Sequence, residues 1–262
     1  MIHRTAFRNG ILGIPMTARI VARGVATLAL TAGIGLAGSR AVDAASTSSP
    51  APTSAPTTAP DTLSLATLKE RCNIAVQRRL GTLAADGTFV KQAAGLTSTD
   101  RTTLASQIRA DQQGLSALDL TIQSDTSFQQ AHADCQRIVT DYRVYVLEEP
   151  KIHETIAADG VTRVNGTLDV LIPELQTLID NSSVSATVKA EAQADLNDLT
   201  GKVSASRTSI LGVTSSVIDL LPAGWPGNQV VLKSDAQNIR TARADLAGAR
   251  ADVNHILQLL GQ

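Results

Sequence analysis

From Leu63 onward, apolar residues recur at spacings of three and four, which is the period of an α-helix. Alternation with a period of two, which would indicate β-strands, is scarce. The pattern predicts an all-α fold with helices near residues 63–85, 100–124, 127–148, 150–180, 184–220 and 229–260.

The last three predicted helices carry apolar residues that repeat every seven positions. The most regular row lies in the final helix and consists of Leu232, Ile239, Leu246, Val253 and Leu260. Such repeats are typical of coiled-coil-like packing, and short turns favour antiparallel neighbours. We therefore expect an elongated antiparallel helical bundle made of two three-helix units in series, at residues 63–148 and 150–262. One longer four-helix bundle with appended helices is the alternative.

Pro150 interrupts the apolar pattern between these two units. Proline removes a hydrogen bond inside a helix but is well tolerated in its first turn. We therefore expect a new helix to begin at Pro150, with a kinked continuation of the preceding helix as the alternative. The preceding helix is expected to bury one stripe, formed by Phe128, Ala131, Cys135, Ile138, Tyr142 and Tyr145.

Residues 1–44 have the pattern of a secretory signal peptide. Arginines precede an apolar run from Val25 to Gly38, and Val42 and Ala44 place small or aliphatic residues at the −3 and −1 positions of a cleavage site before Ala45. The run is shorter than the about 20 apolar residues that span a bilayer. We expect a secreted or envelope-associated chain with no transmembrane segment in its mature form. An uncleaved N-terminal anchor is the alternative.

Residues 45–62 consist mainly of Ser, Thr, Pro and Ala. Such a segment buries too little apolar surface to offset the entropy of ordering it. It predicts a disordered, Pro-stiffened linker between the signal peptide and the helices.

Composition narrows the classes of function. The chain has 262 residues, a net charge of −1 and only 2% aromatic residues. Nucleic-acid binding requires clustered excess Lys and Arg, which this balance excludes. Removing the predicted signal peptide takes away five arginines and one aspartate, which leaves a net charge of −5. This mild acidity indicates no particular partner.

The chain contains two cysteines, and an exported protein favours their oxidation. Cys72 and Cys135 lie at similar depths, about 14 Å and about 12 Å, in the first and third predicted helices. These helices run parallel in an up-down-up bundle. The sequence therefore predicts a Cys72–Cys135 disulfide, with buried free thiols as the alternative.

The densest polar cluster, residues 141–154, contains Tyr142, Arg143 and His153. A di-iron bundle needs Glu-x-x-His pairs from two helices, whereas Glu149 precedes His153 by four residues and no second pair exists. Nucleophile-elbow and nucleotide-binding motifs are absent from the sequence. We therefore predict no enzyme, no cofactor and no metal site.

Trp225 is the single tryptophan and stands in a loop between Pro222 and Pro226. We interpret it as a cap on the end of its own bundle. A docking residue is the alternative, because tryptophan is enriched in interface hot spots. Tyr142, Arg143 and His153 are the other candidate interaction residues.

Three segments carry a resemblance: Cys72–Leu80, Cys135–His153 and Pro222–Gly227. Together they resemble exported all-helical proteins of high-GC Gram-positive bacteria, over residues 63–262. That group has no assigned activity. The resemblance therefore implies an extracytoplasmic location and a helical fold, and it transfers no functional residue.

The expected function is that of a non-enzymatic, envelope-associated spacer or protein-interaction module, with an unknown protein or envelope component as partner. The heptad rows could also pair between chains and give a homo-oligomer. The alternative is a carrier of a small ligand or metal, with its site near the Tyr142–His153 junction.

Overall fold

A computed structural model describes residues 63–262, so the predicted signal peptide (1–44) and linker (45–62) lie outside the described residues. The described chain is helical and contains no strand, which confirms the all-α prediction. None of its helices is both long and apolar enough to cross a membrane. The helices are α2 (Leu65–Gln92), α3 (Ser98–Ser124), α4 (Phe128–Thr140), α5 (Glu149–Asn181), α6 (Ala186–Ile210), α7 (Val213–Ile218) and α8 (Asn228–Leu259), with a π-helical turn η1 (Val144–Glu148) and a 3-10 turn η2 (Pro222–Gly224).

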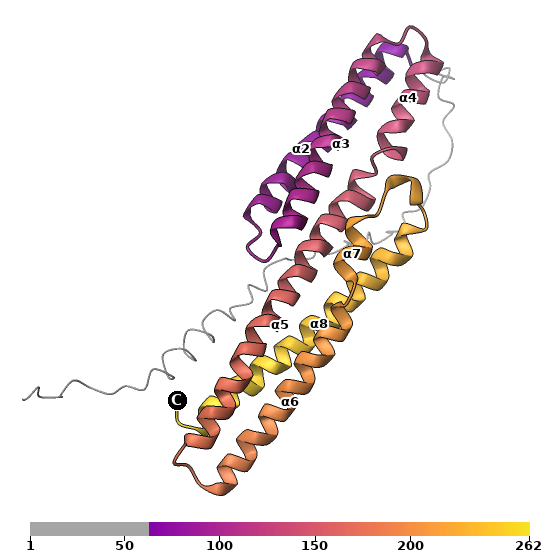
Figure 1. The fold of residues 1–262 in the computed structure, drawn as a ribbon. Helices are drawn as coiled ribbons and strands as arrows, with labels where there is room; N and C mark the ends of the chain where they lie inside the picture. The colour runs from indigo at the N-terminus through magenta and orange to yellow at the C-terminus, as the bar shows by residue number, and fades with distance from the viewer. Residues whose placement is uncertain (1–62) are drawn as a thin grey trace, which may run out of the picture.

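The helices form an elongated bundle around a central series of helical segments, which is interrupted once (Figure 1). This series consists of α4, η1 and α5 in succession. The antiparallel α2–α3 pair packs along its first part, and α6, α7 and α8 pack along the rest. The antiparallel arrangement follows from the short connections between long helices.

Two clusters of buried apolar side chains fill the bundle. One includes Leu83 and Leu104 of the α2–α3 pair, and the other includes Leu199 and Ile256 of α6 and α8. Helix α5 contributes to both, because Ile152 belongs to the first cluster and Ile156 packs against it, whereas residues such as Leu168 and Leu175 belong to the second. The two cores therefore share α5.

The helix starts follow from side-chain caps. The hydroxyl oxygens of Ser64, Thr97, Ser127 and Ser185 each accept a hydrogen bond from the backbone N–H three residues later. Such caps satisfy one of the free N–H groups at a helix start. They place the starts of α2, α3, α4 and α6 within a few residues of the predicted positions.

The first helix continues beyond its predicted end at residue 85. Asp86 is buried at 6% exposure, and the helix ends only at Gln92. Arg101 of α3 donates to the carbonyl oxygens of Lys91 at 2.8 Å and Ala93 at 2.6 Å. This guanidinium satisfies carbonyl groups that the helix end would otherwise leave unpaired.

The third helix ends earlier than predicted, at Thr140 instead of residue 148. Arg143 takes a left-handed backbone conformation with φ of 45°, and η1 begins after it. This break rotates the following residues, so Val144 and Leu147 are buried while Tyr145 is 43% exposed. The prediction that Tyr145 lies on the core stripe is therefore wrong.

Phe128 also lies outside the core, with 42% exposure, because it is the first residue of α4. By contrast, Pro150 stands in the first turn of α5, as predicted.

The predicted helix over 184–220 is two helices. It breaks at Gly212, which has a φ of 77°, and Leu211 beside it is 82% exposed. Glycine adopts this conformation without the steric cost that a Cβ atom imposes. The apolar row nevertheless continues in α7, where Val213 and Val217 are buried.

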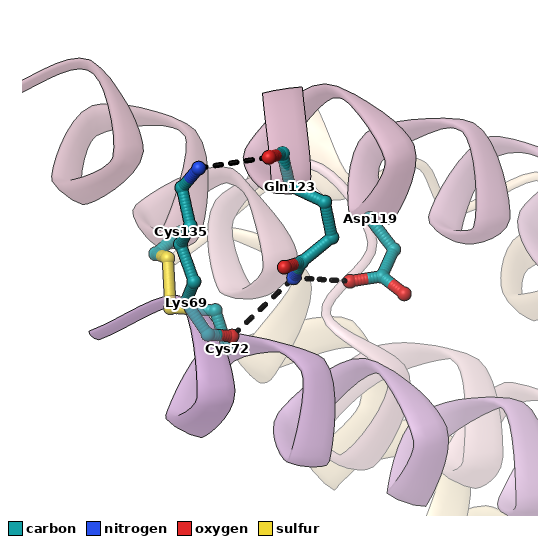
Figure 2. Close-up of a disulfide and its surroundings, with 5 residues drawn as sticks. All are labelled: Lys69, Cys72, Asp119, Gln123 and Cys135. Atoms are coloured by element: carbon teal, nitrogen blue, oxygen red, sulfur yellow. Dashed lines mark hydrogen bonds between the residues drawn. A yellow bond between two sulfur atoms is a disulfide. The ribbon is translucent and has the colours of Figure 1, made fainter. Parts of the chain in front are cut away.

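The predicted disulfide is present. Cys72 of α2 and Cys135 of α4 are bonded, with 5.7 Å between their Cα atoms. Figure 2 shows that a second link lies beside it, in which Lys69 Nζ donates to the carbonyl oxygen of Gln123 at 2.8 Å. The disulfide and this link hold α2 to α4 and to α3 at one end of the molecule.

Replacing both cysteines by serine (Cys72→Ser with Cys135→Ser) should lower the free energy of unfolding. The closed loop spans a sequence separation of 63 residues. Because the disulfide limits the conformations of the unfolded chain, its removal should lower the free energy of unfolding by about 4 kcal/mol. Urea unfolding followed by circular dichroism measures this loss. An unchanged unfolding midpoint would contradict the stabilising role.

Candidate functional site

The residues predicted to form an interaction site all lie near the break between α4 and α5, but only two of them meet. The Arg143 guanidinium lies 5.3 Å from the centre of the Trp225 ring, and its Nε donates to the Pro222 carbonyl oxygen at 3.2 Å. Trp225 therefore packs against a residue of the first predicted unit, in addition to closing the loop before α8. A cap on the end of the C-terminal bundle, as predicted for Trp225, would not include this contact.

The other two residues face different neighbours. The ring of Tyr142 packs against Gly114 of α3. A Cβ atom at position 114 would lie only 2.9 Å from Tyr142 Cε1, so the contact requires glycine. His153 lies against Phe89 of α2, with 5.0 Å between the ring centres. Tyr142, His153 and the Arg143–Trp225 pair therefore do not converge on one pocket.

Arg143 and Trp225 are half-buried, and exposed apolar and aromatic side chains lie beside them in the sequence. Arg79 stacks over Tyr145 at 5.0 Å, and Val146 and Leu221 are 44% and 63% exposed. Aromatic residues and arginine are enriched where proteins bind one another. We call this set the junction surface; it comprises Arg79, Arg143, Tyr145, Val146, Leu221 and Trp225.

A buried ion pair lies beneath this region. Lys151 and Glu148 are 2% and 4% exposed, and their charged groups are 2.6 Å apart. Lys151 Nζ also donates to the Leu220 carbonyl oxygen at 3.3 Å. Burial raises the pKa of Asp111 on α3 to about 6, with Glu148 raising it further and Lys151 lowering it. These charges connect η1 and α5 to α3 and to the segment after α7.

Two further carboxyl groups lie near the start of α5: Asp86 of α2 is buried, and Glu154 of α5 is half-buried. Burial raises the pKa of Asp86 to about 6, the charge of Glu149 adds to the rise, and His153 opposes it. Burial likewise raises the pKa of Glu154 to about 7, with Asp235 adding to the rise. One oxygen of Asp86 and one of Glu154 lack a hydrogen-bond partner within the described chain. Unpaired burial of this kind favours the protonated carboxyl.

A second polar layer holds α7 in place. Asp159 of α5 accepts hydrogen bonds from Thr97 N at 2.9 Å and from Thr214 Oγ1 at 3.0 Å. Ser216 Oγ of α7 donates to Asp235 of α8 at 2.5 Å. Asp159 and Asp235 are 6% and 7% exposed. Helix α7 is therefore tied by buried carboxylates to α5 and α8.

Next to this layer a cavity of about 620 Å³, open to solvent, lies between α5, the end of α6, α7 and the start of α3. Asp159 and Asn165 are among the residues that line it. The sequence analysis identified neither residue, nor the cavity, because it treated 184–220 as one helix. Gly212 was the sequence feature that could have indicated the break in this helix.

In the described part of the chain, no three His, Cys, Asp or Glu side chains are grouped so that they could hold a metal ion. Comparisons of the chain with protein-family models, with curated proteins and with solved structures give no match. The resemblance to exported helical proteins therefore stays a prediction.

The buried carboxyl groups predict that stability decreases as the pH rises. In the folded protein the pKa values of Asp86 and Asp111 are about 6 and that of Glu154 is about 7, above the ordinary values of 3.8 and 4.5. The folded state therefore binds these protons more tightly than the unfolded state, and the stabilisation is lost as pH rises through 6 and 7. Urea unfolding at pH 5 and pH 8 measures the decrease.

Asp86→Asn should reduce this pH dependence, because it removes one titrating buried group. Glu70→Gln serves as the control, because Glu70 lies on the exposed face of the same helix. An equal slope in Asp86→Asn and in the unaltered protein would refute the assignment.

Substitutions of Arg143 test its contact with Trp225 and Pro222. Arg143→Ala removes the stacking on Trp225 and the bond to Pro222, which should cost about 1–2 kcal/mol of unfolding free energy. Arg143→Gly removes the same contacts but relieves the left-handed backbone, so it should be more stable than Arg143→Ala by about 1 kcal/mol. Urea unfolding measures both variants.

The fluorescence of Trp225, the single tryptophan, reports the contact directly. Emission should shift to longer wavelength by a similar amount in both variants. A glycine variant less stable than the alanine variant would contradict the backbone argument.

Proposed function

We propose that this protein acts outside the cytoplasm as a non-catalytic helical spacer that also binds a protein partner through the junction surface. The export rests on the sequence pattern of residues 1–44. The disulfide between Cys72 and Cys135 supports an oxidising compartment, where such bonds persist.

The spacer role is supported by the shape of the bundle. Helix α5 has 33 residues, which corresponds to about 50 Å. The two cores lie one after the other along it, so the molecule extends along one axis (Figure 1). Packed cores on both halves of one helix resist bending between them.

The binding role is supported by one observation above all: half-buried Arg–aromatic contacts lie beside the exposed apolar side chains of the junction surface. Trp225 and Tyr145 each stack with an arginine, and Leu221 beside them is 63% exposed. Arg79 comes from α2 and Trp225 from the loop before α8, so both halves of the molecule build this surface. Lys151 of the buried Lys151–Glu148 pair donates to the carbonyl oxygen of Leu220, which holds the backbone next to Leu221. A rigid aromatic surface loses little entropy on binding.

Site-specific photo-cross-linking in the cells that produce the protein tests the proposal. A benzoylphenylalanine replaces Leu221 in one variant and Leu120 in another. Leu120 is the matched control, because it is 74% exposed on α3 and lies outside the junction surface. We expect a discrete protein adduct from position 221 only, and a clear reduction of that adduct when Trp225→Ala is added. Equal adducts from both positions, or none from position 221, would overturn the binding role.

A further inference from the structure

The antiparallel helices α2 and α3 form a hairpin that is held differently at its two ends. At one end the disulfide joins Cys72 of α2 to Cys135 of α4. The chain has two cysteines, so no second disulfide can form. At the other end, the connection at residues 93–97 lies beside α5 (Figure 1). We call residues 93–97 the hairpin tip; it can leave α5 without breaking a covalent bond.

The hairpin tip touches the backbone of α5. A Cβ atom built at Gly95 would lie 3.0 Å from Gly160 Cα, so the two segments approach more closely than a side chain at position 95 would allow. Beside this contact, the Thr97 N–H donates a hydrogen bond to Asp159 Oδ2 at 2.9 Å. Close packing and a main-chain hydrogen bond therefore dock the tip on α5.

Apolar side chains contribute little to this docking. Ile152 and Ile156 are the α5 residues that belong to the apolar cluster of the hairpin or pack against it. The buried apolar residues that follow on α5, from Ala158 to Ile179, belong to the other cluster. Charged and polar groups therefore have a large share in deciding whether the tip stays docked.

Acidic side chains meet across this contact. In three places a carboxyl group of the hairpin and one of η1 or α5 lie close enough for one to raise the pKa of the other: Asp86 with Glu149, Asp111 with Glu148, and Asp100 with Asp159. Two carboxylates at short range repel each other, and a proton on one of them removes the repulsion. Protonation therefore favours the docked hairpin.

The cations at the contact do not balance these acids. Burial and Glu149 raise the pKa of Asp86 to about 6 against the charge of His153, which opposes the rise only while it carries a proton. Burial and Glu148 raise the pKa of Asp111 to about 6 against the charge of Lys151. Lys151 itself is already paired with Glu148.

Three further groups near the contact keep their charge state between pH 5 and pH 8. Arg101 of α3 donates to carbonyl oxygens around the end of α2. Arg163 of α5 is exposed, and its Nε would lie 3.8 Å from a Cβ atom at Gly95. Arginine stays protonated in this range. Tyr142 stays neutral, because burial and nearby acids, including Asp111, raise its pKa above the ordinary value of 10.0.

Asp86 lies within this contact without support for a negative charge. The side chain is 6% exposed, and its Oδ2 has no hydrogen-bond partner within the described chain. Phe89, three residues further along α2, lies against His153 of α5 with 5.0 Å between the ring centres. Ionised Asp86 would gain hydration if the hairpin moved away from α5, because water stabilises a free carboxylate.

We propose that the α2–α3 hairpin is a pH-controlled flap, which pivots at the Cys72–Cys135 disulfide, docks on α5 while Asp86 and Asp111 are protonated and leaves α5 when they ionise. The proposal does not depend on a partner at the junction surface. It also goes beyond a general loss of stability at high pH, because the tip opens while the core of α6 and α8 stays folded.

The direction follows from the two aspartates. With the hairpin docked, the pKa values of Asp86 and Asp111 are about 6, against an ordinary value of 3.8 for an exposed aspartate. The docked state therefore binds these protons more tightly than the open state, and docking weakens as the pH rises through 6. Between pH 5 and pH 8, each aspartate should weaken docking about tenfold.

Hydrogen exchange of the Thr97 amide in the full-length chain, measured by NMR and corrected for the intrinsic effect of pH, tests the opening. Its bond to Asp159 exists only when the tip is docked. We expect Thr97 protection to fall about a hundredfold between pH 5 and pH 8. If the tip stayed docked, ionised Asp159 would accept this bond more strongly and Thr97 protection would rise. Constant or rising protection would therefore overturn the proposal.

A comparison within the molecule separates opening of the flap from unfolding of the whole chain. The amides of Leu199 and Ile256 lie in the core of α6 and α8. We expect them to remain at least tenfold better protected than Thr97 at pH 8, because local opening needs less free energy than global unfolding. Equal protection at all three amides would show that the whole chain unfolds, which contradicts a flap.

The variant Asp86→Asn with Asp111→Asn removes the two ionising groups. We expect its Thr97 protection to change less than about tenfold between pH 5 and pH 8. Glu70→Gln with Glu191→Gln is the matched control, because it removes two carboxylates from exposed positions and should keep the full change. A full change in the aspartate variant would refute the assignment. If that variant does not fold, the pH comparison in the unaltered protein still decides.

Gly95→Leu supplies a reference for the open state. Its Cβ atom would lie 3.0 Å from the Gly160 backbone, so the tip cannot dock closely. We expect Thr97 protection at pH 5 to fall at least about tenfold in this variant. Gly81→Leu is the control, because a Cβ atom at this position of α2 meets nothing within 4 Å. Equal Thr97 protection in the two variants would contradict docking at Gly160.

Discussion

The packing of α5 against two separate sets of helices is the constraint on which the rest of the structure depends. Its first turns contact the α2–α3 pair through residues such as Ile152, and its later turns contact α6 and α8 through residues such as Leu168 and Leu175. A helix with apolar residues along its whole length needs partners along its whole length. The elongated form of the protein follows, because the two partner pairs cannot occupy the same stretch of α5.

Sharing one helix creates a problem at the point where the two cores meet. There α5 places charged side chains among its apolar ones, and they include Lys151, Asp159 and the half-buried Glu154. Buried charges are tolerated when they are paired or hydrogen-bonded, and otherwise their pKa values shift. Both outcomes occur here: Lys151 pairs with Glu148, although burial still raises the pKa of Glu148, and Glu154 has its pKa raised to about 7. The junction is therefore the part of the molecule whose stability depends most on pH.

Two breaks in the helical path lie beside this junction. The left-handed Arg143 separates α4 from η1, and the left-handed Gly212 separates α6 from α7. The first turns Tyr145 and Val146 outward and places Arg143 against Trp225. The second lets α7 pack against α5. The junction surface thus arises where the chain leaves the helical path, and the regular parts of the helices support it.

The sequence by itself determined the helical class, the approximate helix positions, the start of α5 at Pro150 and the Cys72–Cys135 pairing. These features depend on local periodicity, capping residues and depth along neighbouring helices, all of which can be read within one or two segments. Tertiary structure alone decided the rest. The heptad row continues on both sides of Gly212, so periodicity gave no sign of the break, and Asp159 and Asn165 became cavity residues only when α7 packed beside them. Whether Tyr145 or Val144 is buried depended on one backbone rotation at Arg143, whose stabilising contact, Trp225, lies 82 residues away in the sequence.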